Sequence, residues 1–322
     1  MKTLIKWTAI LLLLILILAI VTAYAPDTDK DKMIAKYGGE QAQFVQMTNG
    51  PMIHYRDQGD RDAPALIMVH GMSSHLQAWE ALIAEIGDDY RLISLDLPGF
   101  GLTGPNPTGK YGPPIYTQAI LAVMDKLGID KGVIVGNSMG GWTAWRMGLS
   151  HPERVSALVL LDPWGAPGEY TEDGNLAFKI MASPIGKFIV PHFTPRFIVE
   201  QSVLQTVEKD EIVTKEMVDR YYELSRYPGN RRATLDIISA SDDLSAWEDI
   251  HRLNMPVLIL WGREDQLIDV TRSDKFADEI EGETLIIYEG VGHLPMEEVP
   301  AKVVHDMKHW LAEDVMDGAA AQ

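Results

Sequence analysis

The sequence predicts an α/β protein with a mostly parallel, doubly wound sheet and a helical insertion. Short apolar runs recur along the chain, helix-like segments separate them, and one long later stretch lacks any such run. Continuous rather than alternating apolar runs are typical of strands buried on both faces, as in a parallel sheet that helices cover. The 322 residues suffice for one large domain with an insertion, or for two domains.

The expected strands follow in order along the chain. An alternating run at residues 52–56 is typical of a strand with one buried face. Continuous apolar runs predict the buried strands, which lie at 66–69, 92–95, 133–135, 157–161, 257–260 and 284–288. Helix-like segments at 115–127, 141–147 and 299–311 lie between or after them. Strands that alternate with helices favour a doubly wound arrangement.

The insertion is expected between the strands at 157–161 and 257–260. From Trp164 to Leu253 we find amphipathic helical segments, early prolines and no convincing buried strand. This stretch is too long for a plain loop in a compact domain. We therefore expect a helical insertion above the carboxyl ends of the strands, where active sites of open α/β sheets lie.

The N-terminus carries an apolar run over residues 4–23, preceded by Lys2 and interrupted only by Lys6. About 20 apolar residues can span a bilayer core as a helix. Basic residues before the run and acidic residues after it predict a cytoplasmic N-terminus, so we expect a single-pass signal anchor in the cell membrane with the main domain outside. The alternative is a signal peptide cleaved near Ala25, giving a secreted or periplasmic protein, although Pro26 suits that cut poorly.

Composition excludes two kinds of chemistry. The chain has no cysteine, so disulfides and thiolate catalysis are impossible. Its formal net charge of -18 argues against a nucleic-acid partner, because such partners bind basic faces.

The sequence Gly-Asn-Ser-Met-Gly at residues 136–140 is the strongest functional signal. It joins the expected strand at 133–135 to the expected helix at 141–147. A serine between small residues at a sharp strand-to-helix turn is typical of a nucleophile elbow. The turn exposes the hydroxyl of Ser138 and places the next backbone N–H at a helix N-terminus, where negative charge is favoured.

A nucleophilic serine needs a base, and the base needs an orienting acid. In this architecture the chain order is serine, acid, histidine. His293 lies in a glycine-rich loop directly after the strand at 284–288, so we expect it to be the base. Asp265, after the strand at 257–260, is the expected acid, with its neighbour Glu264 and the strand-end Asp162 as alternatives.

The developing negative charge on the substrate needs two backbone N–H donors. Met139, directly after the nucleophile, is expected to supply one. Met72, in the loop after the strand at 66–69, is expected to supply the other. His70, in the same loop, is expected to brace the loop by hydrogen bonding rather than to act as a base.

Five segments together carry a family resemblance. They are Val-His-Gly at 69–71, Asp-Leu-Pro-Gly-Phe-Gly at 96–101, the elbow at 136–141, Trp-Gly-Arg-Glu-Asp at 261–265 and Gly-His at 292–293. Over residues 43–311 the chain resembles the α/β-hydrolase superfamily. Within it, the chain resembles membrane-associated or exported bacterial serine lipases and esterases. It is also similar to the meta-cleavage-product hydrolases, which cleave carbon–carbon bonds but usually carry tryptophan where Leu294 stands. Haloalkane dehalogenases and epoxide hydrolases place aspartate at the elbow instead.

The resemblance implies a serine hydrolase that cleaves carboxylic esters through an acyl-enzyme, without cofactor or metal. Trp164 and other apolar residues of the insertion are expected to bind the substrate, a small-molecule ester that can be lipid-like. Carbon–carbon hydrolysis, perhydrolase or haloperoxidase-like activity, and a non-catalytic binding protein are the alternatives.

The expected organisation has six parts. They are the anchor or signal peptide at 1–25, a polar linker at 26–42, the first part of the hydrolase core at 43–163, a helical cap at 164–253, the second part of the core at 254–314, and a tail at 315–322.

Overall fold

The computed structural model describes residues 5–8, 10–11, 13–14, 23–168, 181, 183–239 and 245–316. These residues form one eight-stranded sheet with strand order β1-β2-β4-β3-β5-β6-β7-β8. Its strands are β1 (Gln43–Gln46), β2 (Met52–Gly59), β3 (Ala65–Val69), β4 (Arg91–Leu95), β5 (Gly132–Asn137), β6 (Val155–Leu161), β7 (Val257–Gly262) and β8 (Thr284–Tyr288). β1 and β2 pair antiparallel, as do β2 and β4, and the remaining pairs are parallel.

The predicted fold class is confirmed, and every predicted strand occurs. The continuous apolar runs became the central strands β3, β5 and β7, which are buried throughout. Strand β1 was not predicted, because this short edge strand is only partly buried and has little apolar signal.

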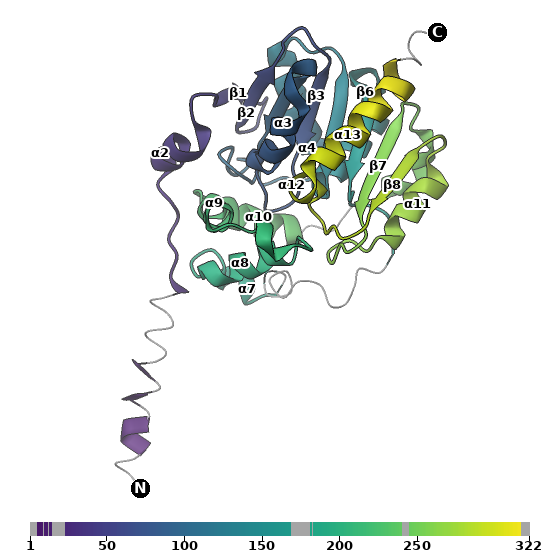
Figure 1. Cartoon of the computed structure of the whole chain (residues 1–322). Helices are drawn as coiled ribbons and strands as arrows, with labels where there is room; N and C mark the ends of the chain where they lie inside the picture. The colour runs from purple at the N-terminus through teal and green to yellow at the C-terminus, as the bar shows by residue number, and fades with distance from the viewer. Residues whose placement is uncertain are drawn as a thin grey trace.

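Helices cover both faces of the sheet (Figure 1). The α-helices are α2 (Lys30–Met33), α3 (Glu80–Ile86), α4 (Pro113–Leu127), α5 (Met139–Ser150), α7 (Gly186–Ile189), α8 (Arg196–Leu204), α9 (Lys215–Ser225), α10 (Asn230–Ser239), α11 (Thr271–Glu279), α12 (Pro295–Glu298) and α13 (Pro300–Trp310). Short 3-10 or π segments are η1 (Ile34–Gly38), η2 (Leu76–Trp79), η3 (Gly87–Asp89), η4 (Pro152–Arg154), η5 (Asp210–Ile212), η6 (Ser245–Arg252) and η7 (Leu311–Met316).

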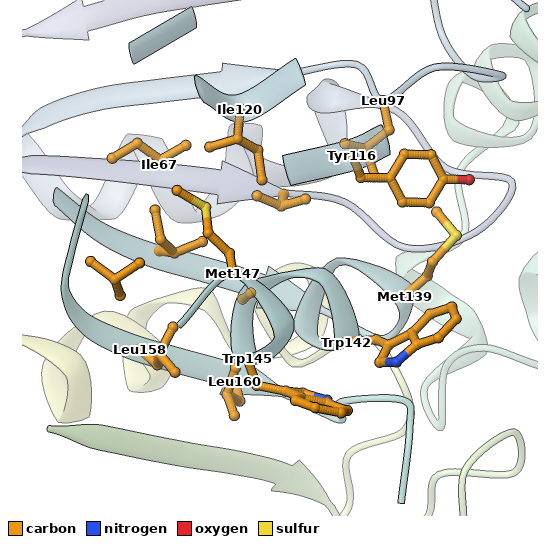
Figure 2. Close-up of a cluster of buried hydrophobic side chains, with 14 of the residues drawn as sticks. Ile67, Leu97, Tyr116, Ile120, Met139, Trp142, Trp145, Met147, Leu158 and Leu160 are labelled. Carbon is orange, nitrogen blue, oxygen red and sulfur yellow. The ribbon is translucent and has the colours of Figure 1, made fainter. Parts of the chain in front are cut away.

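Two apolar cores hold these layers together. One lies between the sheet and helices α4, α5 and α11, and Figure 2 shows part of it, with Trp145 and Met147 of α5 beside Leu158 and Leu160 of β6. The other lies against α3 and α13 on the opposite face. Burial on both faces explains why these strands read as continuous apolar runs.

Helices α7 to α10 and η6 come between β6 and β7, and we call residues 164–253 the cap. In Figure 1 the labelled cap helices gather at one end of the sheet. The described residues of the cap include no strand of the sheet. Helix α9 buries Met217, Val218 and Leu224, so one face of this amphipathic helix packs inward.

Residues 24–38, which we call the N-terminal strap, pack against the cap. The backbone N–H of Ala25 donates to the carbonyl of His192 at 2.8 Å. Arg231 of α10 pairs with Asp27 at 2.7 Å. Farther along, Met33 packs in a small apolar cluster with Leu224 and other buried side chains. Much of the segment expected to be a polar linker therefore makes specific contacts.

The prediction of a membrane-spanning anchor at residues 4–23 is wrong. In the part of the chain that the structure describes, no helix has the length and apolar character needed to cross a bilayer. A span requires about 20 consecutive helical residues. The described helical residues of this segment are 5–8, 10–11, 13–14 and 23, and the others lie outside the described residues. Cleavage near Ala25 stays a prediction.

Candidate active site

Ser138 occupies the sharp turn between β5 and α5. Its backbone angles are φ 56° and ψ −118°, a combination that residues other than glycine rarely adopt. The glycines around it are required by close backbone contacts. A Cβ at Gly140 would lie 2.0 Å from the carbonyl oxygen of Val69, and one at Gly136 would lie 2.4 Å from that of Gly140. The sequence thus permits a turn that lifts the hydroxyl away from the backbone.

His293 and Asp265 meet at the carboxyl end of the sheet, on the loops after β8 and β7. The Nδ1 atom of His293 lies 2.6 Å from Oδ2 of Asp265, and both side chains are buried. The other carboxylate oxygen of Asp265 accepts from the backbone N–H groups of Leu267 and Ile268, at 2.7 and 3.0 Å. These three donors hold the carboxylate of Asp265 in place. A proton on Nδ1 of His293 leaves the lone pair on Nε2.

Neighbouring segments hold the loop that carries His293. The side-chain amide of Asn137 donates to the carbonyl of His293 at 3.0 Å, and the N–H of His293 donates to the carbonyl of Thr206 at 2.8 Å. Glu298 accepts from the N–H of Gly292 at 2.7 Å. The roles of Asn137, Thr206 and Glu298 were not predicted from the sequence. The position of Asn137 beside the nucleophile was the one available signal.

The loop that carries Met72 lies against the elbow. A Cβ on Gly71 would lie 3.2 Å from Cβ of Ser138, and both Met72 and Met139 line the cavity that Ser138 faces. His70 bonds this loop through both ring nitrogens: Nδ1 lies 2.7 Å from the carbonyl oxygen of Gly71, and Nε2 accepts from the N–H of Leu97 at 3.0 Å. Burial lowers the pKa of His70, which favours this neutral form.

The two alternative acids occupy different places. Glu264 accepts from the N–H groups of Gly290 and Val291, at 2.7 and 3.0 Å, and so holds the backbone of the histidine loop. Asp162 is fully buried, and one of its oxygens lies within 4.8 Å of both an Asp265 oxygen and a His293 ring nitrogen.

Two carboxylates and an imidazole this close could offer ligands to a metal ion. Both oxygens of Asp265 and Nδ1 of His293 already take part in hydrogen bonds, however. One oxygen of Asp162 likewise accepts from the N–H of Gly262. A metal ion would have to displace these hydrogen bonds, so the geometry favours hydrogen bonding by these side chains over metal binding.

Ser138 and His293 both line one cavity of about 1150 Å³ between the core and the cap. Most of its other lining side chains are apolar. They include Met72, Trp142, Leu267 and Leu294 from the core, and Trp164, Ile189, Phe193, Phe197, Ile198 and Val203 from the cap. Apolar walls with a few convergent polar groups are typical of a small-molecule site.

A polar contact joins the cap to the core beside this cavity. The hydroxyl of Tyr221, on α9, lies 3.3 Å from the hydroxyl of Ser74 and 3.2 Å from Oε1 of Glu297 on α12. Burial raises the pKa of Glu297 to about 7, although the nearby Arg220 opposes this shift.

We expect replacement of Glu297 by glutamine to change the pH dependence of stability. The folded protein keeps a proton on Glu297 that the unfolded chain releases near pH 4.5. The free energy of unfolding should therefore fall between about pH 4.5 and 7, by at most about 3 kcal/mol. Urea unfolding of Glu297→Gln should lack this fall, while the exposed Glu281→Gln keeps it. Equal pH slopes in Glu297→Gln and wild type would contradict the raised pKa.

The fold and the site together define a hydrolase. An open α/β sheet presents a strained serine and a carboxylate-bonded imidazole to one cavity at its carboxyl edge. The family model described as the alpha/beta hydrolase fold matches residues 64–300, so the chain belongs to that family.

Individual relatives agree with this assignment. The chain is 27% identical over 256 residues to the 2-hydroxy-6-oxo-6-phenylhexa-2,4-dienoate hydrolase of Comamonas testosteroni, covering 75% of this chain and 85% of that protein. A meta-cleavage product hydrolase from Pseudomonas fluorescens IP01 superposes with a TM-score of 0.70 at 25% identity, covering 84% of this chain and 97% of that one. A thermophilic esterase from Thermogutta terrifontis superposes with a TM-score of 0.72 at 24% identity, covering 86% and 100%. This last likeness shows the fold alone.

Proposed function

We propose that the protein hydrolyses carboxylic esters with a large apolar acyl group, through an acyl-enzyme on Ser138. One observation carries this proposal: Ser138 and the His293–Asp265 pair serve the same mostly apolar cavity of about 1150 Å³. A cavity of this size and lining can enclose a long acyl chain while its carbonyl reaches the serine.

The proposed reaction has two steps. Nε2 of His293 takes the proton of Ser138 as its oxygen attacks the ester carbonyl carbon, and the N–H groups of Met72 and Met139 stabilise the oxyanion. The intermediate then collapses, and His293 gives the proton to the leaving alcohol. Water repeats the sequence on the acyl-enzyme and releases the carboxylic acid. Asp265 holds the imidazole in the required tautomer and stabilises its charged form.

The cap has a role in substrate binding under this proposal. Residues 164–253 would cover the carboxyl edge of the sheet and supply much of the apolar wall. Trp164, at the start of this segment, lines the cavity, and its backbone N–H donates to the carbonyl of Ser138 at 3.0 Å. We propose that Trp164 contacts the substrate near the reacting carbonyl.

Carbon–carbon bond hydrolysis is the second candidate. The relative from Comamonas testosteroni is named as a dienoate hydrolase, and one similar structure is a meta-cleavage product hydrolase. Attack on the carbonyl carbon of a vinylogous diketone would use the same serine, base and oxyanion donors. Leu294 stands where those enzymes usually carry tryptophan, which is a difference from that group. The largely apolar cavity also favours the hypothesis of ester hydrolysis.

A substrate panel separates the two candidates. Nitrophenyl esters from acetyl to palmitoyl should show kcat/KM rising with chain length well beyond acetyl. Activity confined to acetyl esters would contradict a large apolar acyl group. A 2-hydroxy-6-oxo-dienoate turned over faster than every ester would instead assign carbon–carbon hydrolysis. Ser138→Ala should be inactive on the whole panel.

A further inference from the structure

Asp162 is a buried carboxyl group that the proposed reaction does not use. It follows β6 directly, has a left-handed φ of 44° and is fully buried. Its Oδ1 accepts from the N–H of Gly262 at 2.8 Å. Its Oδ2 is buried and has no hydrogen-bond partner among the described residues. A buried polar oxygen without a hydrogen-bond partner destabilises the fold, so a partner for Oδ2 is expected among the groups around it.

The neighbours of Asp162 are mostly acidic. An oxygen of Asp162 lies within 4.8 Å of an Asp265 oxygen and a His293 nitrogen. Two further titratable groups, Glu298 and Tyr288, interact electrostatically with Asp162. None of these groups is a lysine or arginine. Two buried carboxyl groups this close do not both ionise, because the second negative charge is neither solvated nor balanced.

The hydrogen bonds decide which carboxyl keeps the proton. Asp265 accepts from the N–H groups of Leu267 and Ile268 and from Nδ1 of His293, and these donors stabilise its negative charge. Asp162 has one such donor, the N–H of Gly262. Burial and the charge of Asp265 raise the pKa of Asp162 well above its usual value.

We propose that Asp162 is a positioning residue of the active site, whose protonated Oδ2 donates a hydrogen bond to the Asp265 carboxylate. This bond satisfies the otherwise unpaired oxygen and fixes the carboxylate against His293. The pair carries one negative charge, so the imidazolium formed in the reaction faces one charge rather than two. The inference rests on the proposed function, because it assigns Asp162 to the relay that serves Ser138.

Two substitutions at Asp162 separate the neutral donor from an ionised carboxylate. In Asp162→Asn, the amide oxygen still accepts from Gly262 and the amide nitrogen donates to Asp265. We expect kcat within about threefold of wild type and an unchanged acid limb of the kcat/KM pH profile. Asp162→Leu has neither donor nor acceptor, so kcat should fall by about 10- to 100-fold with KM unchanged, as expected for loss of a hydrogen bond to a charged group.

Two results would contradict the proposed role of Asp162. If Asp162 were ionised, Asp162→Asn would remove a negative charge beside His293 and shift the acid limb to lower pH. An Asp162→Leu enzyme that is folded and as active as wild type would rule out a positioning role.

Infrared spectroscopy tests whether the Asp162 carboxyl is protonated, and it requires neither an activity assay nor the leucine variant. Protein with ¹³C-labelled aspartate should show the isotope-shifted C=O band of a protonated carboxyl at neutral pH, and Asp162→Asn should lose it. A missing band in wild type overturns this inference. If the band is present but Ser138→Ala keeps full ester hydrolysis, the proposed function fails while the shared proton stands.

Discussion

Replacing Ser138 with alanine should lower kcat by on the order of 10⁴-fold or more and leave the fold intact. The reaction needs the serine oxygen as nucleophile, and the remaining oxyanion donors supply only a small residual rate. Alanine removes one oxygen and keeps the Cβ, so the strained turn and its glycine contacts are unchanged. Ester hydrolysis and labelling by a fluorophosphonate probe measure the effect, and thermal unfolding checks the fold.

Ser150→Ala is the matched control for this prediction. Ser150 ends the same helix, α5, and its hydroxyl donates to the carbonyl of Arg146 at 2.9 Å, away from the proposed chemistry. This variant should keep full labelling and turnover. Strong labelling of folded Ser138→Ala, or no labelling of folded wild type, would contradict the assignment of the nucleophile.

Replacing Asp96 with alanine should lower the free energy of unfolding by about 3–5 kcal/mol, because several buried hydrogen-bond donors lose the charged group that accepts from them. Asp96 is fully buried, with Oδ2 2.7 Å from Nδ1 of His54 and 2.8 Å from the N–H of Leu102. Its Oδ1 accepts from the N–H of Leu76 at 2.8 Å. Alanine leaves these donors unpaired where β2, η2 and the loop after β4 meet. Urea unfolding at neutral pH measures the loss.

The pH dependence of stability gives an independent check on Asp96. Burial alone would raise its pKa, but the hydrogen bond and charge of His54 outweigh this effect and lower the pKa to about 2. Stability from Asp96 is therefore complete above about pH 4 and is lost as the pH falls towards 2. The exposed Asp88→Ala should keep this acid-induced loss, and Asp96→Ala should reduce it. A loss below about 1 kcal/mol in Asp96→Ala would mean that the pair is not a stabilising contact.

Much of the fold could be predicted because its signals are local. The run at 257–260 is apolar at each position because β7 is covered on both faces, and the glycines near Ser138 occur where a Cβ would strike backbone. The edge strand β1 has no such signal, since its residues are only partly buried or exposed. The membrane anchor was predicted from hydropathy alone, and among the described residues no helix is long and apolar enough to cross a bilayer.

The partners of the site depend on contacts between distant segments. From the sequence, Asp265 was the expected acid and Asp162 an alternative, but only the folded chain shows that both carboxyl groups lie beside His293. The bond of Thr206 to the histidine loop and the contact of Tyr221 with Ser74 arise where the cap packs on the core. Hydrophobic periodicity cannot reveal such contacts, because it indicates which face of a segment is buried and not which distant residue packs against that face.

The sequence by itself determined the hydrolase fold, the position of the elbow and the short set of polar residues at the strand ends, because each follows from local burial or local backbone geometry. Only the tertiary structure decided how these polar groups pair, which of two neighbouring carboxyl groups is bonded to His293 and how large a cavity the cap encloses. Those properties depend on distances across the sheet and between core and cap, and such distances exist only once the chain is folded.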